Sequence, residues 1–318
     1  MSLRSALTAG FHRTIERASQ IAERSSRDRH NLDIALQWAL QRAASAQSIL
    51  FPVEYVELLR GCLEKARLAI VEVKSDAGSA ADLATRRFTS MLEALRQVPP
   101  VELATAEAIA LVADSYRGNV EPIELSEWTG DVRSHFEISS SEGIKGRILT
   151  AVVRFMRSNQ CLELGTAYGM SALFILEALK ARAADARLTT LEGYRLLFSL
   201  SSPMLAGRYG SKVACRLGST QEALPELMRS LGPLDLVFHD AGHSREDYVR
   251  DFQSVLPNLR EGAVVLVDDI RWKSGRFFQG DPGCYPGWLE LVRHPRVRRA
   301  AEINETMGAL LLGGEGTR

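Results

Sequence analysis

The chain has 318 residues, and its 39 lysines and arginines balance its 39 aspartates and glutamates, so the formal net charge is zero. This length suits two domains; the lack of a basic excess argues against a nucleic-acid partner, and the lack of an apolar run of ~18 residues argues against a membrane-spanning helix. The four cysteines (Cys62, Cys161, Cys215 and Cys284) form no CxxC pair, which predicts free thiols in a reducing cytoplasm.

Residues 1–120 are predicted to be an all-helical domain. Apolar residues recur there at helical spacing, with helices expected over 53–73, 81–95 and 101–116. An added helical domain with broad apolar faces is expected to dimerise the protein, to form a lid or to dock a partner, and we expect a homodimer. Residues 121–138 contain glycine and proline among mixed polar residues, which predicts a connector.

Residues 139–318 are predicted to form a second domain, of the α/β class. Short apolar runs alternate with helical segments, which is typical of a mainly parallel sheet with helices on both faces. The last two runs are separated by a two-residue link and predict a closing antiparallel hairpin. The strands are expected at Cys161–Leu164, Leu188–Leu191, Val213–Arg216, Leu234–His239, Ala263–Val267, Val297–Asn304 and Met307–Leu312.

The stretch from Leu162 to Ala172 predicts a cofactor loop. A strand ends at Gly165 and a helix begins after Gly169, so the backbone can approach a ligand beside the free N–H groups of the helix. The next strand ends in Glu192, the position where α/β folds hold a ribose by its hydroxyls. The spacing Gly-x-x-x-Gly, rather than Gly-x-Gly-x-x-Gly, favours S-adenosylmethionine, which has no pyrophosphate, over NAD.

Three carboxylates are expected at the carboxyl ends of adjacent strands. Asp240 follows one predicted strand, and Asp268 and Asp269 follow the next. Gathered negative charge is costly unless a cation offsets it, and oxygen ligands suit a hard divalent cation such as Mg²⁺, Mn²⁺ or Ca²⁺. The alternative is that Asp269 caps the following turn and that Asp240 hydrogen-bonds the cofactor.

His243 is the candidate general base. It lies three residues after Asp240, at the start of the next helix, where a neutral imidazole could take a proton from a substrate hydroxyl. The alternative is a helix-start residue that hydrogen-bonds a carboxylate. His239 points to the other face of its strand and is interpreted as structural.

The segment after the last acid is the candidate substrate wall because it is rich in aromatic and basic residues. Arg271, Trp272 and Tyr285 are the residues that we assign to it, and Arg271 favours an anionic or carboxylate-bearing substrate. The alternative for the aromatic residues of this segment is packing of a loop on the core.

Residues 139–318 resemble the class I S-adenosylmethionine-dependent O-methyltransferases of the catechol O-methyltransferase type. The resemblance implies a Rossmann-like fold with a seven-stranded sheet, and methyl transfer to oxygen with divalent-metal help, Mg²⁺ above all. It is carried by several motifs that match together and in order: Lys145–Val152, Glu163–Ala172, Gly218–Gln221, Leu234–Asp240 and Val265–Asp269.

The resemblance also implies a role for each matching residue. Asp240 would act in catalysis beside His243, and Asp240, Asp268 and Asp269 would bind the metal. The two glycines would lie against the methionine part of the cofactor, and Glu192 would hold its ribose. The residues implied in cofactor binding are Ser139, Ser141, Glu163, Gly165, Gly169, Ser171, Glu192, Ser219, Thr220, Gln221 and Asp240.

Two departures from the family's pattern concern the metal and the substrate. The family usually has asparagine at the position of Asp269; the extra negative charge either weakens the metal's effect on the substrate pKa or removes Asp269 from the ligands. The members that act on catechols have lysine at the position of His243, and histidine titrates nearer neutrality. The acceptor hydroxyl therefore stays open among catechols, phenolic natural products and sugars.

Competing interpretations differ in the chemistry that they assign. A metal-independent methyltransferase would use His243 as its lone base and would be insensitive to a chelator. A non-catalytic S-adenosylmethionine-binding regulatory or interaction protein would use the helical domain as its working part. An NAD-linked oxidoreductase would need a pyrophosphate-binding glycine loop, which the sequence lacks.

Overall fold

The computed structural model describes residues 70–75, 82–96, 103–125, 128–139, 144–271, 283–304 and 306–314. Almost all of them lie in one unit, formed by Ala69–Ser141 and Lys145–Arg318. The helices predicted before residue 70, and Cys62, lie outside the described residues.

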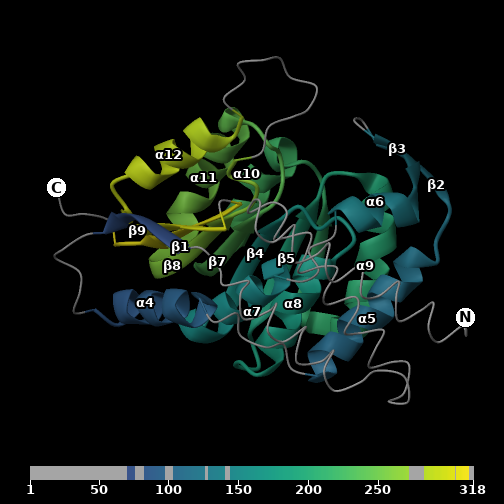
Figure 1. The fold of residues 1–318 in the computed structure, drawn as a ribbon, viewed down its shortest axis with the longest axis horizontal. Coiled ribbons are helices and arrows are strands. Elements are labelled where there is room, and N and C mark those ends of the chain that lie inside the picture. The colour runs from purple at the N-terminus through teal and green to yellow at the C-terminus, as the bar shows by residue number, and fades with distance from the viewer. Residues whose placement is uncertain are drawn as a thin grey trace, which may run out of the picture. The chain divides into compact units, whose positions relative to one another are not determined.

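An eight-stranded sheet forms the middle layer (Figure 1), and its strand order is β1-β9-β10-β8-β7-β4-β5-β6. The strands from β4 to β8 pair in parallel, whereas β10, β9 and β1 pair antiparallel with their neighbours. All seven predicted strands are present, as β4 (Gln160–Leu164), β5 (Arg187–Glu192), β6 (Val213–Leu217), β7 (Leu234–His239), β8 (Leu259–Val267), β9 (Val297–Ile303) and β10 (Met307–Leu312).

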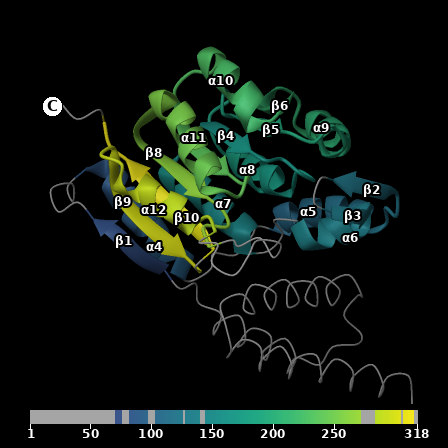
Figure 2. The same cartoon turned by 90° about the horizontal axis from the view of Figure 1, so that it is seen from above.

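The eighth strand, β1 (Ile70–Ser75), corrects the predicted helix over 53–73 at its C-terminal end. It pairs antiparallel with β9 at the edge of the sheet, where Ile70 lies opposite Ile303 (Figure 2). The backbone hydrogen bonds of β9 and the alternation of β-branched with charged residues in this segment favour a strand. Arg299 of β9 reinforces the pair through two hydrogen bonds to the Glu72 carboxylate, 2.9 and 2.6 Å long.

Helices cover both faces of the sheet, with α4, α7 and α8 on one side and α10, α11 and α12 on the other (Figure 1). Two predicted helices of the first domain are confirmed as α4 and α5. The helices are α4 (Leu83–Arg96), α5 (Leu103–Arg117), α6 (Val132–Ser139), α7 (Ile144–Met156), α8 (Met170–Lys180), α9 (Arg195–Tyr209), α10 (Thr220–Ser230), α11 (Arg245–Val255) and α12 (Tyr285–Arg293), with single 3₁₀ turns η2 (Gly210–Lys212) and η3 (Leu256–Asn258).

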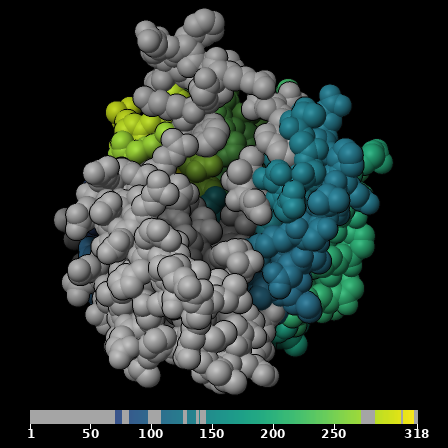
Figure 3. Space-filling model, turned by 45° about the vertical axis from the view of Figure 1, so that its right-hand side comes forward, coloured from purple at the N-terminus to yellow at the C-terminus, as the bar shows by residue number. Residues whose placement is uncertain are grey.

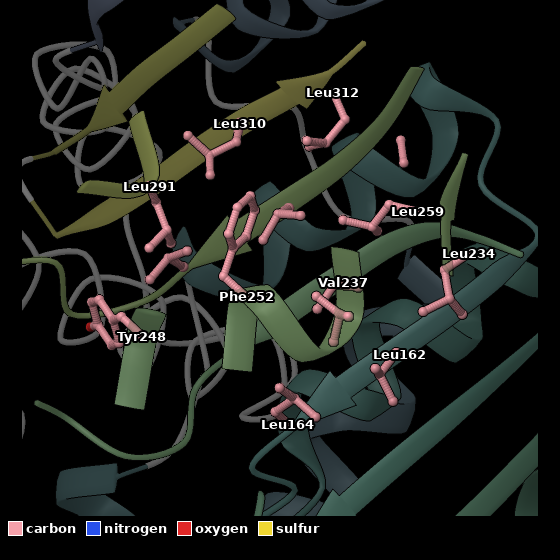
Figure 4. Close-up of a cluster of buried hydrophobic side chains, with 14 of the residues drawn as sticks. Leu162, Leu164, Leu234, Val237, Tyr248, Phe252, Leu259, Leu291, Leu310 and Leu312 are labelled. Atoms are coloured by element: carbon pink, nitrogen blue, oxygen red, sulfur yellow. The ribbon is translucent and has the colours of Figure 1, made fainter. Parts of the chain in front are cut away.

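The core between the sheet and α10–α12 is built from aliphatic strand residues and aromatic helix residues. Leu164 of β4 and Val237 of β7 are fully buried with Phe252 of α11 and Leu291 of α12 (Figure 4). Each strand of a parallel sheet is covered on both faces, which explains the nearly continuous apolar runs seen in the sequence. This packing holds the strand ends in place, and the candidate site lies at those ends.

The predicted connector, residues 121–138, contains regular structure. It forms a hairpin of β2 (Pro122–Leu125) and β3 (Trp128–Asp131), followed by α6. Residues from α5 to α6 make one continuous patch of the surface (Figure 3). Tyr168, from the predicted cofactor loop, is 1% exposed and packs on Phe136 and Tyr116 with ring centroids 5.3 and 5.0 Å apart. The segment therefore anchors that loop.

The division into a domain of residues 1–120 and one of 139–318 stays a prediction, as does the dimerisation, lid or docking role of the first. Within the described residues, β1 and α4 belong to the sheet unit: β1 is a sheet strand, and α4 packs near β10. No helix among the described residues combines the length and the apolar character needed to cross a membrane.

Candidate active site

The carboxyl ends of the parallel strands are tied to one another by backbone hydrogen bonds. The N–H of Gly165 donates to the carbonyl of Leu191 at 2.9 Å, and that of Asp240 donates to Leu164 at 2.8 Å. The N–H of Asp268 donates to the carbonyl of His239 at 2.9 Å. The residues after β4, β5, β7 and β8 are thus held side by side at one edge of the sheet, where ligands of open α/β folds bind.

The cofactor loop has the backbone that its glycines permit. Gly165 has φ +94°, and a Cβ atom placed there would lie 2.0 Å from the backbone oxygen of Asp240. Gly169 has φ +79° and is the N-cap of α8. Both conformations are disfavoured for residues that carry a Cβ, so these glycines allow the strand, the tight turn and the helix to follow one another directly.

Two buried glutamates flank this loop. Glu192 at the end of β5 accepts hydrogen bonds from the N–H groups of Ala167 and Tyr194, each 2.7 Å long. Glu163 in β4 is fully buried; its Oε2 accepts from the Thr190 hydroxyl at 2.6 Å, and its Oε1 has no hydrogen-bond partner among the described residues. Burial raises the pKa of Glu163 to about 8, against the lowering effect of hydrogen bonds from Ser171 and Thr190.

If Glu163 contacts the cofactor, as the resemblance implies, binding of S-adenosylmethionine at pH 7 should release close to ~1 proton, because the cofactor's ammonium would favour the carboxylate form over the acid that burial favours. Calorimetry in two buffers of different ionisation enthalpy measures the release, which should fade above pH 8. In the cofactor-free protein the raised pKa has a second effect: stability falls as pH rises from the ordinary value of 4.5 towards 8.

Glu163→Gln is the matched variant, and it should abolish the proton release and that pH dependence. Equal release by the variant and the wild type would contradict the assignment of Glu163.

The remaining cofactor candidates differ in how their side chains are engaged. Ser171 is buried beside Glu163. Ser219 caps α10: its hydroxyl accepts from the Glu222 N–H at 3.2 Å. The Thr220 hydroxyl accepts from Arg250 at 2.9 Å, and Gln221 is exposed. Ser139 donates to the carbonyl of His135, and Ser141 lies outside the described residues. Their contacts with the cofactor stay predictions.

Asp240, Asp269 and His243 meet at the ends of β7 and β8. His243 Nε2 lies 3.4 Å from Asp269 Oδ2 and 3.9 Å from Asp240 Oδ1. One ligand atom from each residue lies within 4.8 Å of the other two. Asp269 has φ +52°, a left-handed conformation that asparagine and aspartate tolerate better than most residues. This backbone turns the Asp269 side chain towards His243 rather than along the strand.

His243 is 34% exposed and surrounded by acids. Burial lowers its pKa, but the hydrogen bond to Asp269 and the charges of the neighbouring carboxylates outweigh that effect, so the pKa lies above its ordinary 6.5. The imidazole can therefore take up a proton at this edge of the sheet and hold it as a cation beside the acids.

Asp268, predicted with Asp240 and Asp269, is placed differently from both. Its side chain is fully buried, and one of its oxygens pairs closely with the ammonium of Lys145 at the start of α7. The same ammonium lies 3.8 Å from Asp240 Oδ2. The neighbouring carboxylates raise the pKa of Lys145 although burial alone lowers it, so the lysine is charged.

Sequence reasoning included Lys145 in a helix motif but did not assign it to the site. The available signal was a lysine next to Gly146 at the start of a largely apolar helix. A Cβ on Gly146 would lie 2.0 Å from the Phe174 ring of α8, so glycine lets α7 approach that helix closely.

The predicted substrate residues that the structure describes, Arg271 and Tyr285, belong to a hydrogen-bonded cluster around Glu302 of β9. Glu302 is 4% exposed and accepts hydrogen bonds from Arg271 at 2.6 Å, from Tyr285 at 2.9 Å and from the Trp288 indole at 3.0 Å. Because Glu302 neutralises the Arg271 charge, the structure adds no support for an anionic substrate. Trp272 lies outside the described residues, and the substrate roles stay predictions.

We expect Glu302→Ala to lower the free energy of unfolding by ~2–4 kcal/mol, because it leaves the buried Trp288 indole without its acceptor and removes the carboxylate that Arg271 and Tyr285 share. Urea unfolding measures the change. Glu290→Ala is the control, since Glu290 is 43% exposed in its pair with Arg245 and its loss should cost less than ~0.5 kcal/mol. Equal losses of unfolding free energy in the two variants would show that the hydrogen-bonded cluster around Glu302 does not stabilise the protein.

His239 has the structural surroundings predicted for it. It is 4% exposed, and its Nε2 lies 3.0 Å from the buried carboxylate of Asp251 in α11. Its ring also packs edge-on against Tyr248. It therefore lies between the sheet and α11, away from the acids that face His243.

Comparisons with known proteins agree with this geometry. A family model described as a methyltransferase domain matches residues 162–270, which contain the cofactor loop and all three aspartates. The catechol O-methyltransferase of Niastella koreensis is 30% identical over 168 residues, which are 52% of this chain and 68% of that protein. This chain belongs to the class I S-adenosylmethionine-dependent O-methyltransferases. The cofactor of this methyltransferase is S-adenosylmethionine.

Two further comparisons describe the extent of the likeness. The catechol O-methyltransferase of Mus musculus is 33% identical over 132 residues, so this methyltransferase spans about half the length of that relative, 48%. The solved structure of the O-methyltransferase TomG from Streptomyces achromogenes, in complex with S-adenosylmethionine, has a TM-score of 0.51 at 21% identity. It covers 73% of this chain and 100% of that chain. At this identity the structural match shows the fold alone.

Proposed function

We propose that this methyltransferase methylates a hydroxyl of a small molecule that carries two adjacent oxygens, with a divalent cation assisting and His243 as the general base. The observation that carries the proposal is the meeting of Asp240, Asp269 and His243 at the strand ends, next to the glycine loop. The geometry supplies, in one place, carboxylates for a cation and an imidazole for a proton.

The residues at this edge of the sheet fit a divalent cation. Asp240 and Asp269 have partly exposed side chains, 18% and 32%, and carboxylate oxygens are the donors that Mg²⁺ and Mn²⁺ prefer. With His243 neutral, as a base must be, three carboxylates face one ammonium here, so the cluster has negative charge that a divalent cation would cancel. Asp240 and Asp269 would hold the cation, which when bound lowers the pKa of an acceptor hydroxyl.

The protein's own residues have three tasks in this mechanism. The glycine loop and Glu192 place the sulfonium at the strand ends. His243 takes the proton of the acceptor hydroxyl on the imidazole nitrogen that does not donate to Asp269. The oxygen then attacks the methyl carbon in line, forming the O–CH₃ bond as the S–CH₃ bond breaks, and S-adenosylhomocysteine leaves. Most of the rate enhancement would come from positioning the two reactants.

Transfer of a labelled methyl group to a panel of catechols, phenolic compounds and sugar diols tests the proposal. We expect transfer to vicinal diols in the presence of Mg²⁺, loss of transfer in EDTA, and recovery when Mg²⁺ is restored in excess. Transfer that persists in EDTA would overturn the role of the cation and leave His243 as a lone base. Tight binding of S-adenosylmethionine without transfer to any acceptor would favour a non-catalytic binding protein.

A further inference from the structure

Lys145 lies where the acids of the site are most buried. Its side chain is 17% exposed, its ammonium pairs closely with Asp268 Oδ2, and it lies 3.8 Å from Asp240 Oδ2. It comes from the first turn of α7, which precedes in the chain all the strands that carry the acids. A lysine ammonium thus occupies a position between two of the three predicted metal ligands.

We propose that Lys145 is a permanent cation of this site, which holds Asp268 as its ion-pair partner and excludes that carboxylate from metal binding. A divalent cation would then be bound by Asp240 and Asp269, without Asp268. This inference rests on the proposed function only in placing a divalent cation at these acids, and it concerns binding rather than methyl transfer.

The burial of Asp268 is the first step of the argument. Its side chain is fully buried and, apart from the ion pair with Lys145, its oxygens have no hydrogen-bond partner within the described part of the chain. A carboxylate in such surroundings is very unfavourable unless a cation stays beside it. Lys145 supplies that cation within the fold itself, so the buried Asp268 carboxyl already has a partner without a metal.

The difference in access between the acids is the second step. Asp240 and Asp269 are 18% and 32% exposed, and they lie within reach of His243, whereas Asp268 is closed off behind Lys145. The charges agree with this division when His243 is neutral, because the ammonium cancels one of the three carboxylates and one divalent cation would cancel the other two. Removing the lysine would leave the Asp268 carboxylate without its counter-ion, and that carboxylate could then bind a metal cation.

The test measures binding of Mn²⁺ alone, by the loss of the free-ion signal in electron paramagnetic resonance, and thermal unfolding with and without Mn²⁺. The variants are Lys145→Met and Lys145→Met/Asp268→Asn. The double variant is the matched control because it removes the ion pair as a whole and keeps the net charge of the wild-type cluster.

We expect Lys145→Met to bind Mn²⁺ at least ~10-fold more tightly than the wild type, since it loses a positive charge near the ion and gains a free carboxylate. Its midpoint of unfolding should fall in EDTA and rise with Mn²⁺ by more than the wild type's does. The double variant should bind Mn²⁺ within ~3-fold of the wild type, because the two clusters carry equal charge.

Two results would overturn the proposal. The first is Mn²⁺ binding by Lys145→Met that is no tighter than binding by the wild type, or no Mn²⁺ binding by any variant. Either outcome would show that the lysine does not keep Asp268 from a cation. Binding by the double variant at least ~10-fold weaker than by the wild type would make Asp268 a ligand despite Lys145. If Lys145→Met does not fold, the comparison of the double variant with the wild type still decides. None of these measurements depends on an acceptor, so a failure to detect methyl transfer is separate from them.

Discussion

Replacing His243 by glutamine is expected to lower kcat for methyl transfer by ~10²–10⁴-fold, the usual contribution of a positioned general base. Glutamine retains a hydrogen-bonding side chain of similar length but cannot accept the proton. The wild-type His243 Nε2 lies 3.4 Å from Asp269 and 3.9 Å from Asp240, so the imidazole faces the place where the acceptor hydroxyl would be held. Steady-state kinetics with a labelled methyl group measures the loss.

The pH profile separates a base from a structural residue. Only the neutral imidazole can take a proton, and the acids around His243 raise its pKa above 6.5. In the wild type kcat/KM should therefore rise with pH as the imidazole of His243 loses its proton, and His243→Gln should lack this limb. Affinity for S-adenosylmethionine should stay within ~3-fold, because the residue lies at the ends of β7 and β8 rather than in the glycine loop.

Mn²⁺ binding by His243→Gln tests the alternative that His243 is a metal ligand rather than the general base. If His243 is the base, His243→Gln should bind Mn²⁺ about as tightly as the wild type. A loss of activity together with a ~10-fold or greater loss of Mn²⁺ affinity would instead make the imidazole a metal ligand, which its position among Asp240 and Asp269 also permits.

Gly165→Ala is expected to destabilise the protein by ~3 kcal/mol or more and to abolish measurable binding of S-adenosylmethionine. At φ +94° any Cβ is strained, and here it would lie 2.0 Å from the backbone oxygen of Asp240, which is not the movable end of a flexible side chain. The backbone of β4 or β7 must move to relieve the clash. That movement would displace both the cofactor loop and Asp240.

Thermal unfolding and calorimetric titration with the cofactor measure these effects, and Gly207→Ala is the matched control. Gly207 is exposed in α9, and a Cβ there would meet nothing within 4 Å. Alanine is the better helix former, so the control should gain ~0.5–1 kcal/mol and bind the cofactor normally. Normal cofactor binding by Gly165→Ala would show that the loop does not need this backbone conformation.

Much of the α/β region could be predicted because its signals are local. Each of the seven strands is a short apolar run bounded by turn residues, and parallel strands covered on both faces require such runs. The glycine spacing predicts a strand, turn and helix because only glycine tolerates the backbone at Gly165 and Gly169. Topology then places Glu192, Asp240 and Asp269 together, since the ends of parallel strands share one edge of the sheet.

Other features depend on partners far away in the chain, and local sequence could not reveal them. Ile70–Ser75 is a strand because β9, more than 220 residues later, offers an edge for pairing. Arg271 is neutralised by Glu302, and Tyr168 is drawn into the cluster around Phe136. In each case a contact between distant segments outweighs the tendency of the residue's own neighbourhood.

The sequence by itself determined the parallel sheet, the glycine loop and the set of acids at the strand ends, because periodicity and backbone conformation are local properties. Tertiary structure alone decided how those acids are used. Asp268 and Asp269 are adjacent in sequence, yet one is buried against Lys145 and the other turns towards His243. The reason is the left-handed backbone of Asp269 and the close packing of α7 at Gly146, which bring a lysine to one acid and leave the other accessible.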